Sequence, residues 1–232
     1  MKTKLIALLL VMLSVSGSIM AQDDGKVAFG VLGGVNLQNL TGKDSDGDPI
    51  EDNGLLPGFH AGINVILPVA PDFYIQPGLL FSTKGAKFTY EAPTKADDND
   101  IVVKYIPYYL ELPVNFLYRP VLGNGHMLLG FGPYAAYGIG GKITSEFGGE
   151  SQESKIKFKS PVTEDDYEED VSYLRPFDAG ANIFFGYELN MGLFLHLNAQ
   201  LGLLKVNPEY EGSDDDGFIK NTGFGLSLGY RF

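Results

Sequence analysis

The sequence predicts an all-β fold, an eight-stranded antiparallel up-and-down transmembrane β-barrel, and three observations lead to it. Apolar residues alternate with polar or small ones, with a period of two, in eight segments. The connectors between these segments are alternately long and short. The face opposite the apolar one is mainly glycine and amide side chains, which suits a narrow interior better than a surface in water.

The N-terminus has the layout of a secretory signal peptide. Lys2 and Lys4 precede an apolar run over residues 5–15, and small residues lead from there to Ala21. This run is shorter than the roughly 20 residues that span a bilayer as a helix. We therefore expect residues 1–21 to be cleaved and residues 22–232 to form one outer-membrane β-barrel domain.

Eight strands follow, and each is about as long as a transmembrane β-strand or longer. We place them at residues 27–38, 58–67, 73–88, 102–119, 127–142, 177–188, 193–204 and 222–232. In five of them the apolar face is given by every second residue: Phe59 to Leu67, Ile106 to Tyr118, Phe177 to Tyr187, Leu193 to Leu203 and Phe224 to Phe232. A soluble sandwich would carry many Lys, Glu and Thr residues on its outer face, so we assign the apolar face to lipid.

The connectors support this assignment independently. The long ones span residues 41–57, 89–101, 143–176 and 205–221, and the short ones span residues 68–72, 120–126 and 189–192. Outer-membrane barrels have short periplasmic turns and long extracellular loops in the same alternation. An even number of strands places both termini in the periplasm, so we expect an integral protein of the outer membrane with extracellular loops.

Composition excludes several classes of function. The chain of 232 residues has no Cys and a net charge of −12. Without Cys it has no disulfide, no thiol nucleophile and no Cys-ligated metal. Its acidic excess repels phosphate backbones, so we expect no nucleic-acid partner. The sequence contains no phosphate-binding loop and no paired-His metal motif, and we assign no cofactor.

The acidic residues gather in the long connectors, which hold 23 of the 29. The extracellular face is therefore expected to be acidic and the barrel wall nearly free of charge. The first long connector begins like a calcium loop with Asp44, Asp46 and Asp48. It then has Pro49 where that motif requires Gly and Leu55 where it requires Glu, so we assign no metal site.

Short segments along the mature chain resemble, in order and spacing, the PorT-like outer-membrane β-barrel proteins of Gram-negative bacteria. These segments are Gly33-Gly34-Val35-Asn36-Leu37, Pro57 to Gly62, Ile75 to Gly85, Tyr109 to Val114, Gly132-Pro133-Tyr134 with Gly141-Lys142, Phe177 to Gly180, and Leu226 to Phe232. The resemblance implies a single barrel in the outer membrane. The family's namesake is associated with a protein secretion system, so the resemblance also implies an accessory role in secretion.

The last strand ends in phase with its apolar face, at Leu226, Leu228, Tyr230 and Phe232. A terminal aromatic residue with apolar residues at alternate positions before it is similar to the C-terminal signal of bacterial barrels. We therefore expect the barrel-insertion machinery and outer-membrane lipid to be partners of this protein.

Seven charged residues are expected to face the interior by the same alternation. They are Lys84, Glu111, Arg119, Lys142, Asp178, Glu188 and Arg231. Eight strands leave an interior that side chains fill, and buried charges must be paired. We therefore expect a salt-bridged plug and no open pore, with an ion pathway as the alternative.

A catalytic site is not assigned. His60, Ser82 and Asp178 all face inward by alternation and supply the residue types of a Ser-His-Asp site. A triad is recognised by its geometry rather than by its residue types, so a lipid-modifying enzyme is only an alternative.

The function we expect is that of a non-enzymatic barrel with a structural or interaction role, whose partners are periplasmic or extracellular proteins. Two further functions are compatible with the sequence. One is an accessory component of a protein secretion or translocation system, and the second is a channel for small solutes or hydrophobic ligands.

Overall fold

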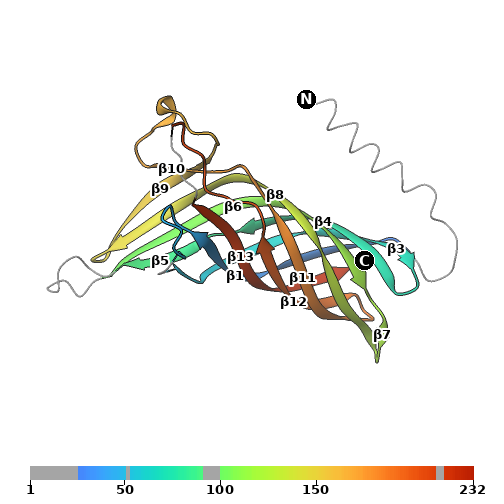
Figure 1. Ribbon diagram of the computed structural model, residues 1–232. Helices are drawn as coiled ribbons and strands as arrows, with labels where there is room; N and C mark the ends of the chain where they lie inside the picture. Colours follow the sequence, from blue (N-terminus) through green and yellow to red (C-terminus); the bar gives the residue numbers. More distant parts are fainter. Residues whose placement is uncertain (1–25, 51–52, 91–99, 213–216) are drawn as a thin grey trace.

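The computed structural model describes residues 26–50, 53–90, 100–212 and 217–232. The predicted signal peptide at residues 1–21 lies outside the described residues, so its cleavage stays a prediction. Within the described ranges, no helix is long and apolar enough to cross a membrane. Long tilted strands make up most of the molecule (Figure 1).

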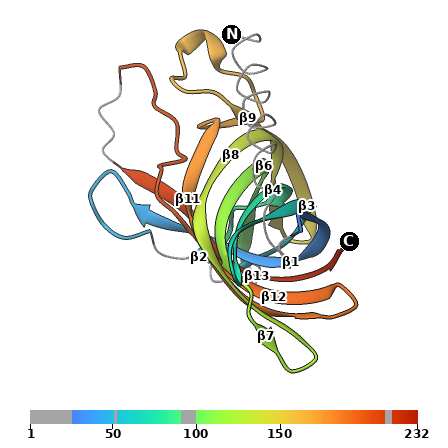
Figure 2. The ribbon, with the colours of Figure 1, turned by 90° about the vertical axis from the view of Figure 1, so that its right-hand side faces the viewer.

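Eight antiparallel strands form a closed barrel, which confirms the predicted fold. In order around the ring they are β1 (Ala28–Lys43), β3 (Leu56–Ala70), β4 (Phe73–Thr83), β6 (Ile101–Tyr118), β8 (Gly125–Phe147), β11 (Phe177–Leu189), β12 (Leu193–Gly202) and β13 (Phe218–Arg231). The ring closes because β13 pairs with β1, from Gly30 opposite Arg231 to Lys43 opposite Phe218. Figure 2 shows the strands arranged around the barrel interior.

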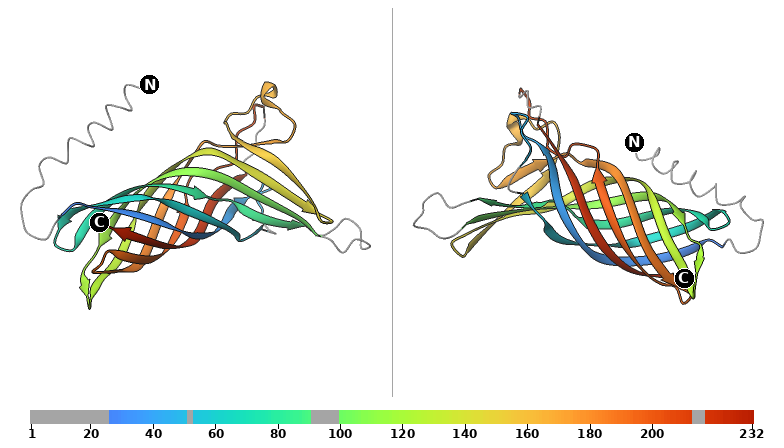
Figure 3. Two further views of the ribbon diagram at one scale, coloured as in Figure 1. Left: turned by 180° about the vertical axis from the view of Figure 1, so that it is seen from behind. Right: turned by 60° about the horizontal axis from the view of Figure 1, so that its bottom comes forward.

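Shorter elements extend the barrel at both ends. At the end with the long connectors, here the long-loop end, these are β2 (Asn53–Gly54), β5 (Ala86–Tyr90), β9 (Glu150–Phe158), the 3-10 helix η2 (Glu164–Asp166) and β10 (Val171–Leu174). The opposite, short-turn end carries β7 (Val121–Leu122). Figure 3 shows the yellow hairpin of β8 and β9 continuing well past the barrel.

Two expectations are corrected at the long-loop end. The strand predicted at residues 73–88 is interrupted at Lys84 and Gly85, so that β5 is a separate strand paired with β6. Gly85 has a φ of 112°, and a Cβ atom there would lie 1.9 Å from the carbonyl oxygen of Tyr105, so the break requires glycine. The connector expected at residues 143–176 contains strands β9 and β10. Strand β8 continues five residues past its predicted end to Phe147, β9 pairs with this extension, and β10 pairs with β9.

The two faces of the wall have the expected character. Outward residues such as Phe59, Phe131 and Leu197 are 54–62% exposed and form an apolar belt around the barrel. Inward residues are buried and mainly polar: Asn36, Gln38, His60, Asn64, Gln76, Asn115, Asn221 and Ser227. The apolar surface therefore faces lipid, as in other transmembrane barrels.

An apolar cluster nevertheless lies inside the barrel near the short-turn end. Its buried members are Ile66, Tyr74, Leu117, Leu128, Phe184 and Phe194. Each projects inward from a different strand, close to the turns. This internal cluster fills the lumen with apolar groups at that level, and the alternation of the sequence did not predict it.

Lys142 does not face the interior, and a β-bulge explains why. The register between β6 and β8 shifts by one residue, because Tyr108 opposes Gly140 while Tyr109 opposes Gly138. A one-residue shift moves all later side chains of the strand to the opposite face. Beyond the bulge Ile143 is buried, whereas Lys142 forms an ion pair with Glu153 on β9. The expectation of an inward Lys142 is therefore wrong.

Neighbouring glycines on β1 test the packing of the wall. A Cβ atom at inward Gly34 would lie 2.0 Å from the carbonyl oxygen of Leu226, whereas one at outward Gly33 would have ordinary contacts of 3.7 Å or more. We expect Gly34→Ala to lower the free energy of unfolding by about 1–3 kcal/mol and Gly33→Ala to change it little. Urea unfolding in detergent, followed by the gel shift between folded and boiled protein, measures both. Equal midpoints for the two variants would contradict this packing.

Candidate functional site: a filled lumen and a folded loop module

Six of the seven residues predicted as interior charges lie in the lumen, and they form two separate groups. Lys84, Glu111 and Asp178 make up the long-loop charge group. Arg119, Glu188 and Arg231 make up the short-turn charge group. Alternation predicted which residues point inward, but it gave no information on which of them meet.

The long-loop charge group is built around one ammonium. Lys84 Nζ lies 3.0 Å from Asp178 Oδ2 and 3.4 Å from Glu111 Oε1, and its side chain is fully buried. The same nitrogen lies 4.2 Å from the centre of the Tyr134 ring, which adds a cation–π contact. Gln200 donates a hydrogen bond to Glu111, and Asn221 donates one to Asp178. Each buried charge therefore has an oppositely charged partner and at least one hydrogen bond, although Asp178 Oδ1 accepts none from the described residues.

The short-turn charge group has the opposite composition, with one carboxylate between two guanidinium groups. Arg119 Nη2 donates to Glu188 Oε1 at 2.7 Å, and Arg231 Nε donates to Glu188 Oε2 at 2.8 Å. Charge-assisted bonds of this kind are among the strong hydrogen bonds in proteins. They join the segment that follows β6 to strands β11 and β13 across the lumen.

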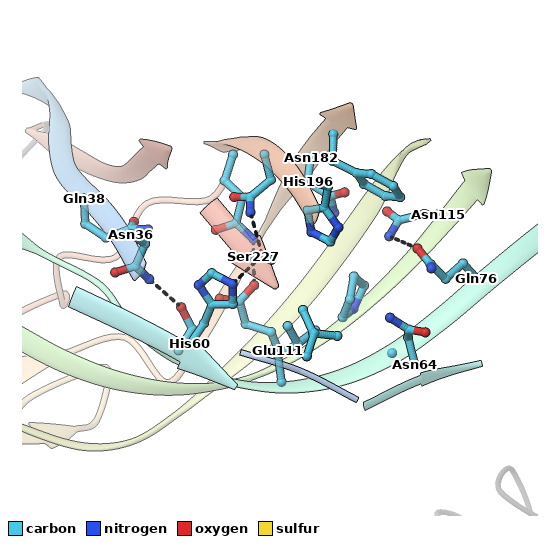
Figure 4. Close-up of a pocket in the computed structure, with 18 residues that line it drawn as sticks. Asn36, Gln38, His60, Asn64, Gln76, Glu111, Asn115, Asn182, His196 and Ser227 are labelled. Carbon is cyan, nitrogen blue, oxygen red and sulfur yellow. Dashed lines mark hydrogen bonds between the residues drawn. The ribbon is translucent and has the colours of Figure 1, made fainter. Parts of the chain in front are cut away.

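Between the two groups lies a cavity of about 80 Å³. Amide side chains line it, as Figure 4 shows, with Glu111 among the lining residues. Ligand sites for small molecules usually have volumes of roughly 300–1,000 Å³. The cavity therefore has room for a few water molecules and is too small for a substrate or a permeating solute.

The structure does not bring the predicted Ser-His-Asp residues together as a triad. His60 Nε2 lies 2.6 Å from Ser227 Oγ instead of Ser82 (Figure 4). Ser82 Oγ accepts a hydrogen bond from Asn36, and Asp178 is held by Lys84. Sequence reasoning missed the contact with Ser227, although its inward position among glycines of the last strand was visible. The Ser227 side chain is fully buried beside a cavity too small for a substrate, so this pair is not assigned a catalytic role.

The long-loop end of the lumen is covered by side chains from the connectors. The Phe158 ring from β9 packs edge-on against Tyr109, with ring centres 5.3 Å apart. Val206, from the connector before β13, is buried against Leu40 and Ala86. Side chains therefore fill the lumen at this end, at the two charge groups and at the internal apolar cluster.

The third and fourth long connectors fold against each other into one unit, here the loop module, which comprises residues 159–176 and 203–212. Val162 forms a β-bridge with Tyr210, and its amide donates to the carbonyl oxygen of Glu209 at 2.8 Å. Arg175 Nε donates to the carbonyl oxygen of Asn207 at 2.9 Å, and its guanidinium forms an ion pair with Glu209. Val162 is buried. The two connectors are therefore joined by a β-bridge, backbone and side-chain hydrogen bonds and an ion pair, with Val162 buried between them and solvent excluded from its side chain.

The surface of the loop module is aromatic and acidic. Tyr167 and Tyr210 stack with ring centres 6.4 Å apart and 15° between planes. They are 65% and 36% exposed. Among the described residues of the module, Glu164, Asp165, Glu169, Asp170 and Glu211 form no ion pair. This surface thus carries two exposed rings surrounded by negative charge.

Within the described part of the chain, no cluster of His, Asp and Glu residues is arranged to hold a metal ion. In the first connector, Asp44 Oδ1 instead accepts the backbone amides of Asp46 and Asp48, at 3.0 and 2.9 Å.

The chain matches one known family of outer-membrane proteins. Residues 20–206 match the family model described as "Outer membrane protein beta-barrel domain". The chain belongs to this family. It is therefore an integral protein of the outer membrane. The short-turn end is the periplasmic end, and the long-loop end is the extracellular end.

Three solved structures of outer-membrane proteins are similar to this outer-membrane barrel. Ail, the attachment invasion locus protein of Yersinia pestis, is 12% identical with a TM-score of 0.36, over 90% of this chain and 100% of that chain. Neisserial surface protein A is 11% identical with a TM-score of 0.39, over 89% and 99%. OprG from Pseudomonas aeruginosa is 12% identical with a TM-score of 0.39, over 90% and 97%. These similarities transfer no function to this chain. No curated protein matches it.

The apolar residues of the last strand face outward, with Phe232 74% exposed and Leu228 54% exposed. Their role as an insertion signal stays a prediction.

The long-loop charge group supplies a test of the filled lumen. Lys84→Met leaves two buried carboxylates without their cation, so we expect it to lower the free energy of unfolding by about 3–5 kcal/mol. Lys104→Met is the matched control, because Lys104 pairs with Glu146 at 2.7 Å while both side chains are substantially exposed. It should cost at most about 1 kcal/mol. Urea unfolding in detergent compares them, and equal stability of the two variants would refute a buried, essential Lys84.

The loop module supplies a pH test. Lys159 and the amide and hydroxyl of Thr163 hold the pKa of Asp166 at about 2, below its ordinary value of 3.8. A lowered pKa in the folded state contributes stability above about pH 4, and this contribution is lost as the pH falls through 2. We expect Thr163→Ala to raise the pKa of Asp166, measured by NMR titration of its carboxyl carbon. A titration unchanged by Thr163→Ala would show that this hydrogen bond is not made.

Proposed function

We propose that this protein is a non-enzymatic interaction barrel that presents an acidic, aromatic surface to cationic segments of extracellular proteins. The observation that carries the proposal is the loop module, whose two connectors fold into one unit with Tyr167 and Tyr210 exposed on it. The bridge, hydrogen bonds and ion pair between the two connectors hold these rings in place, which lowers the entropy lost on binding.

The chemistry of the surface favours a basic partner, and arginine in particular. Aromatic faces attract cations, and guanidinium groups stack on them while donating paired hydrogen bonds to carboxylates. The five unpaired carboxylates of the module lie on the same two connectors as the rings. They also raise the rate at which a cationic partner arrives.

The lumen supports an interaction role rather than transport. Side chains from the connectors, the long-loop charge group and the internal apolar cluster occupy it, and the mid-barrel cavity of about 80 Å³ leaves no room for a solute. The accessory role in secretion, which rests on the resemblance to PorT-like proteins, is a second candidate. A pocket at the periplasmic end favours it, because a secretion component needs a contact on that side.

The test uses the folded protein in a non-ionic detergent and a fluorescent nona-arginine peptide. We expect the peptide to bind, and the double variant Tyr167→Ala/Tyr210→Ala to weaken binding about fivefold to thirtyfold, since two exposed cation–π contacts contribute about 1–2 kcal/mol. Tyr90→Ala is the control, because Tyr90 is similarly exposed but lies on β5, outside the module. The gel shift on boiling shows that each variant is folded.

One result would contradict the role of the loop module, and two others would establish a channel or an enzyme instead. If the double variant binds nona-arginine as tightly as the unmodified protein does, the module is not the interaction surface. A large steady conductance in planar bilayers would establish the channel in its place. Modified lipid A in cells that express the protein, lost on Ser227→Ala, would establish the enzyme.

A further inference from the structure

The periplasmic mouth of the barrel holds more cationic side chains than carboxylates. A pocket of about 560 Å³ opens there, and Lys26, Arg119, Arg231 and Glu188 lie in its lining. Among the side chains of the lining, three cations thus face one carboxylate. Lys26 is exposed and forms no ion pair with any described residue. The mouth therefore has the opposite charge from the loop module at the other end of the barrel.

Arg231 is the buried member of this set. It is 6% exposed, and its Nε donates to Glu188 while Nη1 lies 3.4 Å from Asn64 Oδ1. Its third nitrogen group, Nη2, has no hydrogen-bond partner among the described residues. Nη2 is itself closed to solvent, so Arg231 contributes uncompensated positive charge behind the pocket, and Arg119, with 16% of its side chain exposed, is the guanidinium that an incoming carboxylate reaches.

Glu188 shows which kind of group fits between these arginines. Its two carboxylate oxygens accept from Arg119 and Arg231 at 2.7 and 2.8 Å, so the guanidinium groups are oriented for carboxylate geometry. A single carboxylate leaves one positive charge of the pair uncompensated. His126 and Asn190 also line the pocket, and Tyr74, Met191 and Phe232 give a peptide an apolar surface to pack on.

We propose that the periplasmic mouth is a docking site for an acidic segment of a periplasmic protein, one carboxylate of which enters beside Arg119 and Arg231. Lys26, at the rim, pairs with a neighbouring acidic side chain of the same segment. The site does not depend on the extracellular loop module. It gives the barrel a second contact, on the opposite side of the membrane and with the opposite preference for charge.

The experiment uses the folded protein in a non-ionic detergent and a fluorescent hexa-glutamate peptide, with fluorescence polarisation at low salt as the readout. The acidic loop module repels this probe, so binding reports the mouth. We expect Lys26→Gln and Arg119→Gln each to weaken binding by at least about threefold. Arg119→Gln leaves Glu188 paired with Arg231, so the fold is retained. Lys87→Gln, at the far end of the barrel on β5, is the control and should bind as the unmodified protein does.

Three results would overturn the proposal. One is the absence of binding at low salt. Another is binding that neither Lys26→Gln nor Arg119→Gln weakens. The last is displacement of the peptide by inorganic phosphate, or by nanodiscs containing phosphatidylglycerol, as effectively as by unlabelled hexa-glutamate at equal ionic strength. That result would assign the mouth to oxyanions in general or to lipid headgroups. Hexa-glutamate tests the periplasmic mouth and nona-arginine tests the extracellular loop module. A negative result for one proposal is therefore distinguishable from a negative result for the other.

Discussion

Closure of the sheet between β13 and β1 is the constraint on which the rest of this structure depends. Hydrocarbon offers no hydrogen bonds to backbone groups, so every strand needs a partner on both sides. The long antiparallel pairing from Gly30 and Arg231 to Lys43 and Phe218 removes the last free edge. Closure with eight strands also fixes a narrow interior. The interior must then be filled, and that requirement places the charge groups, the amide-lined cavity and the internal apolar cluster.

The sequence was sufficient to predict the fold and the side of the wall on which most residues lie, because both follow from a period of two. It was insufficient wherever a local irregularity or a long-range contact decides. The bulge opposite Tyr108 and Tyr109 moves Lys142 out of the interior, and no periodicity shows a single inserted residue. The contact between His60 and Ser227 depends on where two strands far apart in the chain meet across the lumen.

The connectors illustrate a different limit. Acidic composition predicts solvated loops, and the charged residues of the loop module are indeed largely exposed. However, a few apolar residues among them determine the structure. Val162 and Val206 are almost fully buried, and Phe158 packs on Tyr109 at the long-loop end of the lumen. The bridge between Val162 and Tyr210 joins two connectors that are separated by two complete strands, β11 and β12. The composition of the connectors averages over these few residues and therefore does not predict the loop module.

The charge groups relate the lumen to the two surfaces. Strand β11 carries Asp178 toward the extracellular end and Glu188 toward the periplasmic end, and each anchors one group. In the first group, two carboxylates share one ammonium, and in the second, two guanidinium groups share one carboxylate. The excess charge is thus negative below the acidic loop module and positive at the cationic mouth. Because both groups are held by the same rigid strands, the barrel keeps this polarity fixed and offers each side of the membrane a surface of opposite sign.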